Sequence, residues 1–186
     1  MFSKLILTVL AAASAALAAP LEARQSPSYF TPSATFQYSV RDGAIYPAGW
    51  GYVAKYPQNQ GYDYTTLLTF TYPQAVAGRK CRLEFVADSG SVYAYGSRQL
   101  DVFTSLRPAP AGGASGWPPG NQRDANLGRL AVPESGAATW SAKYGAYLTE
   151  FTDCKAPGTV QGLELVGVSD EDIVSFPPSA VRIAYQ

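Results

Sequence analysis

The chain has 186 residues, which is enough for one domain with a hydrophobic core and too few for two comfortable ones. Its formal net charge is zero, so we expect no nucleic-acid partner and no attraction to an anionic membrane surface. Aromatic residues make up 13% of the sequence and charged residues only 15%, the reverse of the balance in a disordered chain. Histidine is absent, which excludes catalytic triads and metal sites built on imidazole.

The N-terminal residues have the pattern of a secretory signal peptide. Lys4 precedes an almost unbroken apolar run from Leu5 to Leu17, and a small-x-small exit ends at Ala18. We therefore predict that residues 1–18 are a signal peptide and that the mature protein has no membrane segment. The expected location is extracellular or in a cell wall, where the surroundings are oxidising.

Residues 19–24 follow the predicted signal peptide and end at a single basic residue, Arg24. The sequence leaves open whether they form a cleaved pro-segment or an unprocessed leader. Residues 25–186 are predicted to form a single secreted domain.

Short alternating segments, divided by turn residues, follow one another along this domain. Phe36 and Tyr38 alternate with polar residues before the turn Asp42-Gly43, and residues 66–72 place Leu68, Phe70 and Tyr72 on one face. The further strand candidates are residues 81–85, 92–95, 100–105, 128–132, 138–140, 147–152, 159–166, 173–176 and 181–185. This pattern predicts an all-β fold, an antiparallel two-sheet β-sandwich. The alanines near 137–146 leave room for one short helix.

The segment from Pro108 to Gln122 interrupts this pattern. More than half of its residues are proline or glycine, so it cannot form a central strand or a helix. A loop of this length is usually functional or disordered. Trp117, near its centre, is either an exposed recognition tip or an anchor that folds back onto the loop.

Cys81 and Cys154 are the only two cysteines, and in a secreted chain we expect them to bond to each other. Cys81 shares a strand face with Leu83 and Phe85, which places its sulfur at the core. Without a CxxC spacing, the bond is structural and not redox-active. Two buried free thiols and an intermolecular bridge are the alternatives.

The sequence around these cysteines resembles a fungal family of secreted domains. The segment Gly78-Arg79-Lys80-Cys81-Arg82-Leu83-Glu84-Phe85 resembles its Gly-basic-x-Cys-x-Leu-x-Phe strand, and residues 151–165 are similar to its latter half. The family is the But-two C-terminal domain, named after a yeast protein that binds the Uba-three subunit of a ubiquitin-like activating enzyme. Over residues 30–186 the resemblance implies a β-sandwich displayed outside the cell or in the wall, with no catalytic residues to carry over.

The segment 46–64 is the main candidate for ligand binding. Tyrosine and tryptophan rings stand there beside Gly, Pro, Asn and Gln, a combination that suits the apolar faces and hydroxyl groups of sugars. Cell-wall polysaccharide is therefore one expected partner and an extracellular protein is another. In the alternative interpretation the tyrosines fill the sandwich, with Tyr52 and Tyr56 on the core side of a strand. The candidate ligand-binding residues are Tyr46, Trp50, Tyr52, Tyr56, Tyr62, Tyr64 and Trp117.

Carboxylate side chains are the remaining candidates for metal binding or catalysis. The run Ser169-Asp170-Glu171-Asp172 matches no EF-hand spacing, so we predict a solvated turn and no metal. A carboxylate pair could serve a glycosidase without histidine. The available acids are expected to point outward from strands: Glu84, Asp88, Glu150, Asp153 and Glu164. We predict a non-catalytic protein without a cofactor that acts by surface contact; a carboxylate-based polysaccharide-acting enzyme and an effector-like protein-binding module are the alternatives.

Overall fold

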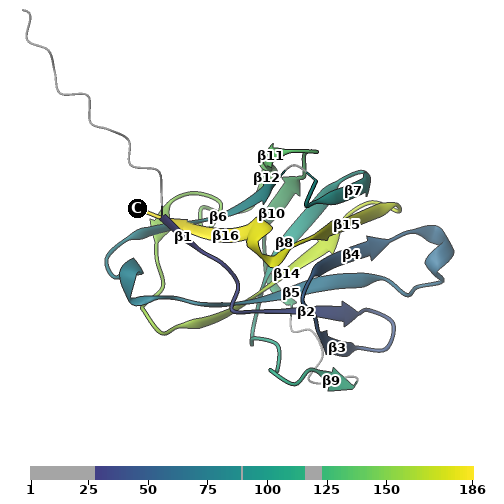
Figure 1. Cartoon of the computed structure of the whole chain (residues 1–186), viewed down its shortest axis with the longest axis horizontal. Coiled ribbons are helices and arrows are strands. Elements are labelled where there is room, and N and C mark those ends of the chain that lie inside the picture. The colour runs from purple at the N-terminus through teal and green to yellow at the C-terminus, as the bar shows by residue number, and fades with distance from the viewer. Residues whose placement is uncertain (1–27, 89, 116–122) are drawn as a thin grey trace, which may run out of the picture.

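Two antiparallel sheets pack face to face, and the larger of them curls into a half-barrel (Figure 1). The computed structural model describes residues 28–88, 90–115 and 123–186. Within these ranges it has sixteen strands and three one-turn 3₁₀ helices, and every strand pair is antiparallel. The predicted antiparallel β-sandwich with one disulfide is confirmed. The predicted signal peptide, the segment 19–24 and Trp117 lie outside the described residues.

The smaller sheet has the strand order β1–β16–β6–β11, and β13 also pairs with β6. Its strands are β1 (Ser28–Phe30), β6 (Lys80–Ala87), β11 (Gly136–Ala137), β13 (Thr152–Asp153) and β16 (Val181–Tyr185). The 3₁₀ helices are η1 (Pro57–Asn59), η2 (Gln74–Val76) and η3 (Pro178–Ala180). None of the helices in the described ranges is long and apolar enough to cross a membrane.

The larger sheet has the order β12–β10–β8–β14–β5–β2–β3–β9. These strands are β2 (Ala34–Ser39), β3 (Ala44–Pro47), β5 (Tyr64–Thr71), β8 (Gln99–Ser105), β9 (Ala114–Ser115), β10 (Arg123–Ala131), β12 (Thr139–Lys143) and β14 (Val160–Gly167). A three-stranded arm branches from β5 through the pair Ala54–Tyr64. The arm has the order β4–β15–β7 and consists of β4 (Gly51–Lys55), β15 (Asp172–Phe176) and β7 (Tyr93–Gly96).

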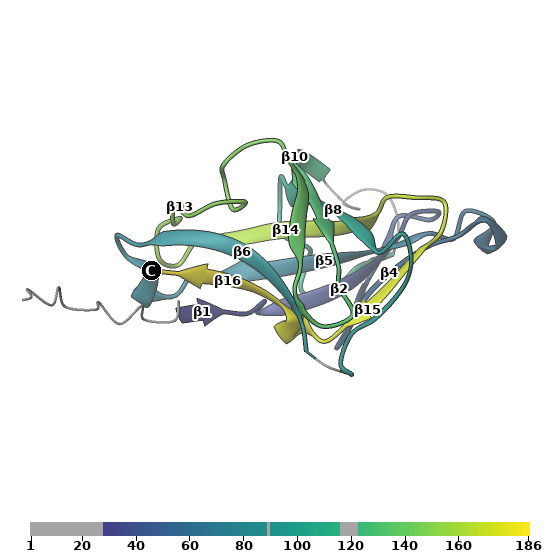
Figure 2. The same cartoon turned by 90° about the horizontal axis from the view of Figure 1, so that it is seen from above.

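The main core lies between the two layers. Figure 2 shows β6, β16 and β1 of the smaller sheet side by side at the end of the molecule that carries the C-terminus. Alternate residues of each strand enter the core, as the period of two requires. Leu68, Phe70 and Tyr72, which the sequence places on one face, are all buried there. The arm contributes Val174 and Phe176, and the ring of Phe176 meets that of Phe85 edge-on at 5.1 Å between centroids.

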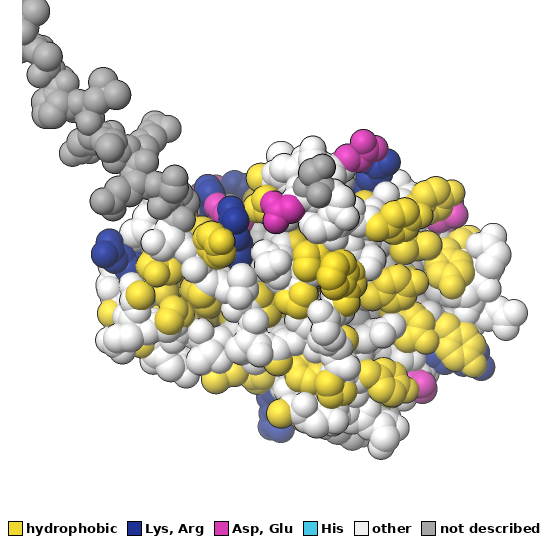
Figure 3. Space-filling model, in the orientation of Figure 1, with side chains coloured by type: hydrophobic (Ala, Val, Ile, Leu, Met, Phe, Trp, Pro, Cys, Tyr) yellow, Lys and Arg dark blue, Asp and Glu magenta, His cyan; other side chains and the backbone are white. Residues whose placement is uncertain are grey.

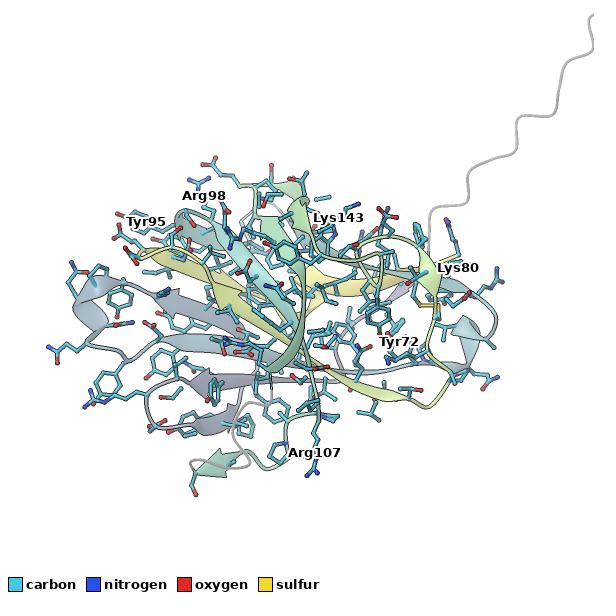
Figure 4. The ribbon with its side chains drawn as sticks, turned by 180° about the vertical axis from the view of Figure 1, so that it is seen from behind. Tyr72, Lys80, Tyr95, Arg98, Arg107 and Lys143 are labelled. Atoms are coloured by element: carbon cyan, nitrogen blue, oxygen red, sulfur yellow. A yellow bond between two sulfur atoms is a disulfide. The ribbon has the colours of Figure 1, made fainter. Side chains whose placement is uncertain are left out.

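Tyr72 brings a hydroxyl group into the core, where it must find a partner. It donates to Gln161 Oε1 at 2.8 Å, and Tyr147 donates to the same oxygen at 2.8 Å. Burial, with a contribution from Tyr147, raises the pKa of Tyr72, so its phenol stays protonated. Figure 4 shows Tyr72 inside the molecule.

A second, smaller core covers the opposite face of the larger sheet. It is built from Phe36, Tyr38, Ile45 and Leu67, and Ala109 and Ala114 from the Pro/Gly-rich segment pack against it. Gly113 adopts φ 77°, and a Cβ there would lie 2.3 Å from the carbonyl oxygen of Ile45. The described part of this segment therefore closes over the sheet, and glycine is what allows its approach.

Two local predictions were wrong. Residues 147–152 do not form a strand, because the N–H groups of Thr149 and Glu150 both bond to the carbonyl of Ala146 in a tight turn. Residues 137–146 contain no helix, because β12 pairs with β10 and places Trp140 opposite Leu130. A local turn replaced the expected strand in the first place, and sheet pairing replaced the expected helix in the second.

The disulfide joins Cys81 of β6 to Cys154, which follows β13, as predicted. Thr152 pairs with Cys81 in the sheet, and the two Cα atoms of the bridge are 4.9 Å apart. The bond lies beside Lys80 (Figure 4) and ties the 144–154 segment to β6. It indicates that the protein matures in an oxidising compartment.

We predict that the Cys81→Ala/Cys154→Ala variant folds with a lower free energy of unfolding. The bridge closes a loop with a sequence separation of 73 residues. Cross-linking a loop of that length lowers the entropy of the unfolded chain by an amount worth about 4 kcal/mol. Urea unfolding followed by tryptophan fluorescence measures the difference, with the wild type in dithiothreitol as the matched control. An unchanged midpoint would contradict the structural role of the bond.

Candidate functional site

The arm carries exposed aromatic side chains on its outer side. Its inner side is filled by Val53, Val174 and Phe176, so the intervening residues of each strand must face away from the core. We call Trp50, Tyr52, Tyr93 and Tyr95, with Ile173 and Ser175 between them, the aromatic face. Figure 3 shows hydrophobic side chains gathered over the part of the molecule that carries β4, β7 and β15.

Strand register sets the spacing within the aromatic face. Tyr52, Ser175 and Tyr93 lie opposite one another on the three neighbouring strands. Because neighbouring strands are ~4.8 Å apart, Tyr52 and Tyr93 are separated by about 10 Å across the arm. Tyr95 lies two residues further along β7, opposite Ile173. Side chains of Trp50, Tyr93 and Tyr95 are 47%, 59% and 49% exposed.

Trp50 is held in place by a hydrogen bond. Its indole Nε1 donates to Ser175 Oγ at 2.7 Å, which fixes the ring against β15. The next residue, Gly51, has to be a glycine, because a Cβ there would lie 2.2 Å from Cε2 of the buried Phe176. An exposed Trp that is already oriented loses little conformational freedom when a ligand covers it.

Tyr52 links the aromatic face to β5. Its ring is 6.2 Å from that of Tyr64 between centroids, and its backbone N–H and C=O both bond to Thr66 Oγ1. Partial burial, and to a smaller extent the nearby Tyr56 and Tyr64, raise the pKa of Tyr52. The phenol is therefore neutral at physiological pH and available as a donor.

Two adjoining hollows lie where the arm meets β5 and share Lys55 and Asp63. The larger has a volume of about 380 Å³ and is also lined by Tyr56, Asn59 and Asp170. The smaller has a volume of about 190 Å³, and Tyr64 and Arg123 are among its lining residues. The first volume is within the range of small-molecule sites.

Arg123 at the smaller hollow forms an ion pair with Glu164, which is fully buried. Nε and one terminal nitrogen of Arg123 donate to the two carboxylate oxygens at 2.8 and 2.7 Å, and Thr65 Oγ1 donates to Oε1 at 2.7 Å. The hydrogen bonds to Glu164 raise the pKa of Arg123. Glu164 lies on the side of β14 that faces away from the main core, as alternation predicts, but that side is not open to solvent, because this arginine and the second core cover it.

A third hollow, of about 520 Å³, opens between β6 and β12. Arg82, Glu84, Arg182, Lys143 and Trp140 are among its lining residues. Glu84 bonds to both arginines, at 2.6 and 3.0 Å, and Lys143 pairs with Glu150 at 3.1 Å, so all three cations are already engaged within the protein.

The structure divides the predicted ligand-binding residues among several places. Trp50 and Tyr52 lie on the aromatic face, while Tyr56 and Tyr64 line the adjoining hollows. Tyr46 is exposed on β3, and Tyr62 lies on the loop before β5, with Arg41 Cζ 4.0 Å from its ring centroid. The alternative prediction that Tyr52 and Tyr56 fill the core was wrong, because Gly51 and Val53 occupy the core side of β4. Both tyrosines are half-buried outside it.

Tyr93 and Tyr95 were not predicted as ligand-binding residues. The signal was present, since Tyr93-Ala94-Tyr95 alternates within a predicted strand and would put both rings on one side. The sequence did not indicate that β7 pairs with β15, which on its other side pairs with β4.

The five carboxylates considered for catalysis are spread over the molecule. Glu150 pairs with Lys143 at 3.1 Å and Asp153 with Lys80 at 2.6 Å. Glu84 and Glu164 are held by arginines, as described above. Asp88 is exposed at the end of β6. Of the five, only Glu84 lines any of the three hollows described here.

The acidic run at 169–172 forms a turn that its last residue closes. The buried Asp172 accepts hydrogen bonds from Ser97 Oγ at 2.6 Å and from the N–H groups of Val168 and Ser169 at 2.9 and 2.8 Å. Asp172 therefore caps this turn from inside the protein, so the run is not solvated throughout as predicted. Within the described ranges no group of three or more acidic, cysteine or histidine side chains could hold a metal ion.

No family model matches the sequence, and no curated protein matches it. The resemblance to the But-two C-terminal domain therefore stays a prediction.

We predict that Arg123→Met lowers the free energy of unfolding by about 3 kcal/mol, because it deprives a fully buried carboxylate of its cation. The double variant Arg123→Met/Glu164→Leu should be more stable than the single one, since no buried charge then needs compensation. Urea unfolding of both variants gives the comparison. If Arg123→Met alone changes stability by less than about 0.5 kcal/mol, the pair does not carry the structural role assigned to it.

Proposed function

We propose that this protein is a non-catalytic secreted or cell-wall-associated fungal β-sandwich that binds polysaccharide through the aromatic face. The single observation that carries the proposal is the set of exposed rings of Trp50, Tyr93 and Tyr95 on one side of the arm. The disulfide supports an extracellular location because such bonds persist in oxidising compartments.

The chemistry of the aromatic face suits a sugar polymer. Aromatic rings pack against the C–H faces of sugar units, while the phenol groups and Ser175 supply hydrogen bonds to hydroxyl groups. No charged residue is part of the aromatic face, which favours a neutral polymer such as glucan or chitin. A Tyr or Trp has only two side-chain torsions to order, so the entropic cost of contact is low.

An extracellular protein is the second candidate partner, since exposed Tyr and Trp are also enriched at protein interfaces. An effector-like module of this kind would use the same aromatic face. The test below separates the two candidates because it uses purified polysaccharide with no protein partner present.

We predict that Trp50→Ala and Tyr93→Ala each weaken retention on insoluble polysaccharide by about tenfold, and the double variant by more. Each ring contributes apolar contact worth ~1.4 kcal/mol, which corresponds to that factor. The measurement is a depletion isotherm of the secreted protein on insoluble β-glucan and on chitin.

Tyr144→Ala is the matched control, because Tyr144 is 61% exposed and lies beyond β12, away from the arm. It should bind as the wild type does. Equal retention of the wild type and all four variants on both polymers would overturn carbohydrate binding by the aromatic face.

A further inference from the structure

We propose that the larger hollow, lined by Lys55, Tyr56, Asn59, Gly61, Asp63 and Asp170, is a second binding site that takes a neutral soluble oligosaccharide. The proposal goes beyond the aromatic face and does not rest on it, because none of the four rings of that face lines this hollow.

The wall formed by residues 56–63 is cross-linked by its own hydrogen bonds. Asn59 Oδ1 accepts from the N–H of Gly61 at 2.9 Å, and Asn59 Nδ2 donates to Asp63 Oδ1. The Tyr56 carbonyl accepts from Asn59 N at 3.1 Å, and the Asp63 carbonyl from Val40 N at 2.9 Å. Gln60 and Gly61 both adopt positive φ, 55° and 83°, which makes the turn compact.

The opposite wall is held by the buried carboxylate of Asp172. Its hydrogen bonds to the N–H groups of Val168 and Ser169 fix the turn that carries Asp170. Lys55 is opposite Asp172 in the pairing of β4 with β15, so its backbone is fixed as well. The hollow is therefore formed before any ligand arrives, which lowers the cost of binding.

Two of the three charged side chains in this hollow, Lys55 and Asp170, are not engaged by other side chains of the described residues. Ion pairs engage Lys80, Arg82, Arg98, Arg123, Arg129, Lys143 and Arg182. Lys55 is half-buried, yet among the described residues it forms no ion pair or side-chain hydrogen bond, and the same holds for the Asp170 carboxylate. Charged groups that face a hollow in this state can bond to a ligand without breaking an existing contact.

The lining matches a sugar with several hydroxyl groups. Carboxylates accept from hydroxyl donors, the Lys55 ammonium donates to hydroxyl acceptors, and the Tyr56 ring offers a face for C–H groups. An anionic sugar fits less well, because the two aspartates outnumber the single lysine and repel it. The hydroxyl groups of a neutral sugar can bond to Lys55 and to both aspartates, whereas an ammonium group of a cationic sugar can bond only to the aspartates. A volume of about 380 Å³ leaves room for one or two sugar units, so the site is suited to the end of a short chain.

The test is a titration of the disulfide-intact secreted protein, followed by ¹H–¹⁵N NMR, with four soluble hexasaccharides. Laminarihexaose and N-acetylchitohexaose are neutral, the deacetylated chitosan hexamer is cationic, and hexagalacturonate is anionic. We expect a neutral hexamer to bind, with shifts at residues 55–63 and 170. Lys55→Met, Asp170→Asn and Tyr56→Ala should each weaken that binding about tenfold, the loss expected for one charge-assisted hydrogen bond or one ring contact.

Lys80→Met and Asp153→Asn are the matched controls, because they change the same kinds of residue in an exposed ion pair beside the disulfide. Binding of only a charged hexamer, binding of no hexamer, or equal weakening by the controls would each overturn the proposal. Trp50→Ala should still bind the soluble hexamer, and Lys55→Met should still be retained on insoluble polysaccharide. Failure of this site is thereby distinguishable from failure of the aromatic face.

Discussion

The contact between Phe176 and Gly51 is the constraint on which both candidate sites depend. Phe176 is fully buried, and its ring occupies the space where any side chain at residue 51 would begin. This contact seats β15 against β4 with their inner sides toward the core. The period of two along a strand then leaves Trp50, Tyr52 and Ser175 no place except the outer side. The exposure of the aromatic face follows from packing beneath it.

The position of the arm also determines the larger hollow, which lies at the end of β4. β4 leaves the arm at Lys55 and returns into β5 at Tyr64, so the loop between them has to turn within a few residues. The turn that leads into β15 must end where Asp172 meets Lys55. Because both turns are fixed by hydrogen bonds to Asn59 and Asp172, the two walls are placed by the same strand pairing that orders the rings.

Much of this architecture could be predicted from local sequence. Leu68, Phe70 and Tyr72 alternate in one strand, and Cys81, Leu83 and Phe85 in another, so their burial follows from period-two patterning. The disulfide follows from the presence of two cysteines and a predicted oxidising location. These inferences need only the strand itself and the existence of some core.

The candidate sites could not be predicted in the same way, because they depend on which strands are neighbours. Tyr52 and Tyr93 are far apart in the sequence and meet only because β15 pairs with both of their strands. Glu164 alternates like an outward residue, yet the covering of the outer face by Arg123 and the second core buries it. Which side of a strand is the core side depends on the whole fold, so alternation alone assigned Tyr52 and Tyr56 to the wrong side.

The disulfide and the aromatic face are also separated in space. Figure 4 shows Tyr95 of the aromatic face and Lys80, the neighbour of the disulfide, at opposite ends of the molecule. The bridge and the paired charges of β6 hold the end where the smaller sheet carries β13, whereas the arm is held by buried apolar side chains. A disulfide stabilises mainly by restricting the unfolded chain, so it adds stability without altering the geometry of the distant rings. The exposed residues of the arm can therefore be substituted without loss of the fold, as long as the side that faces the core is kept.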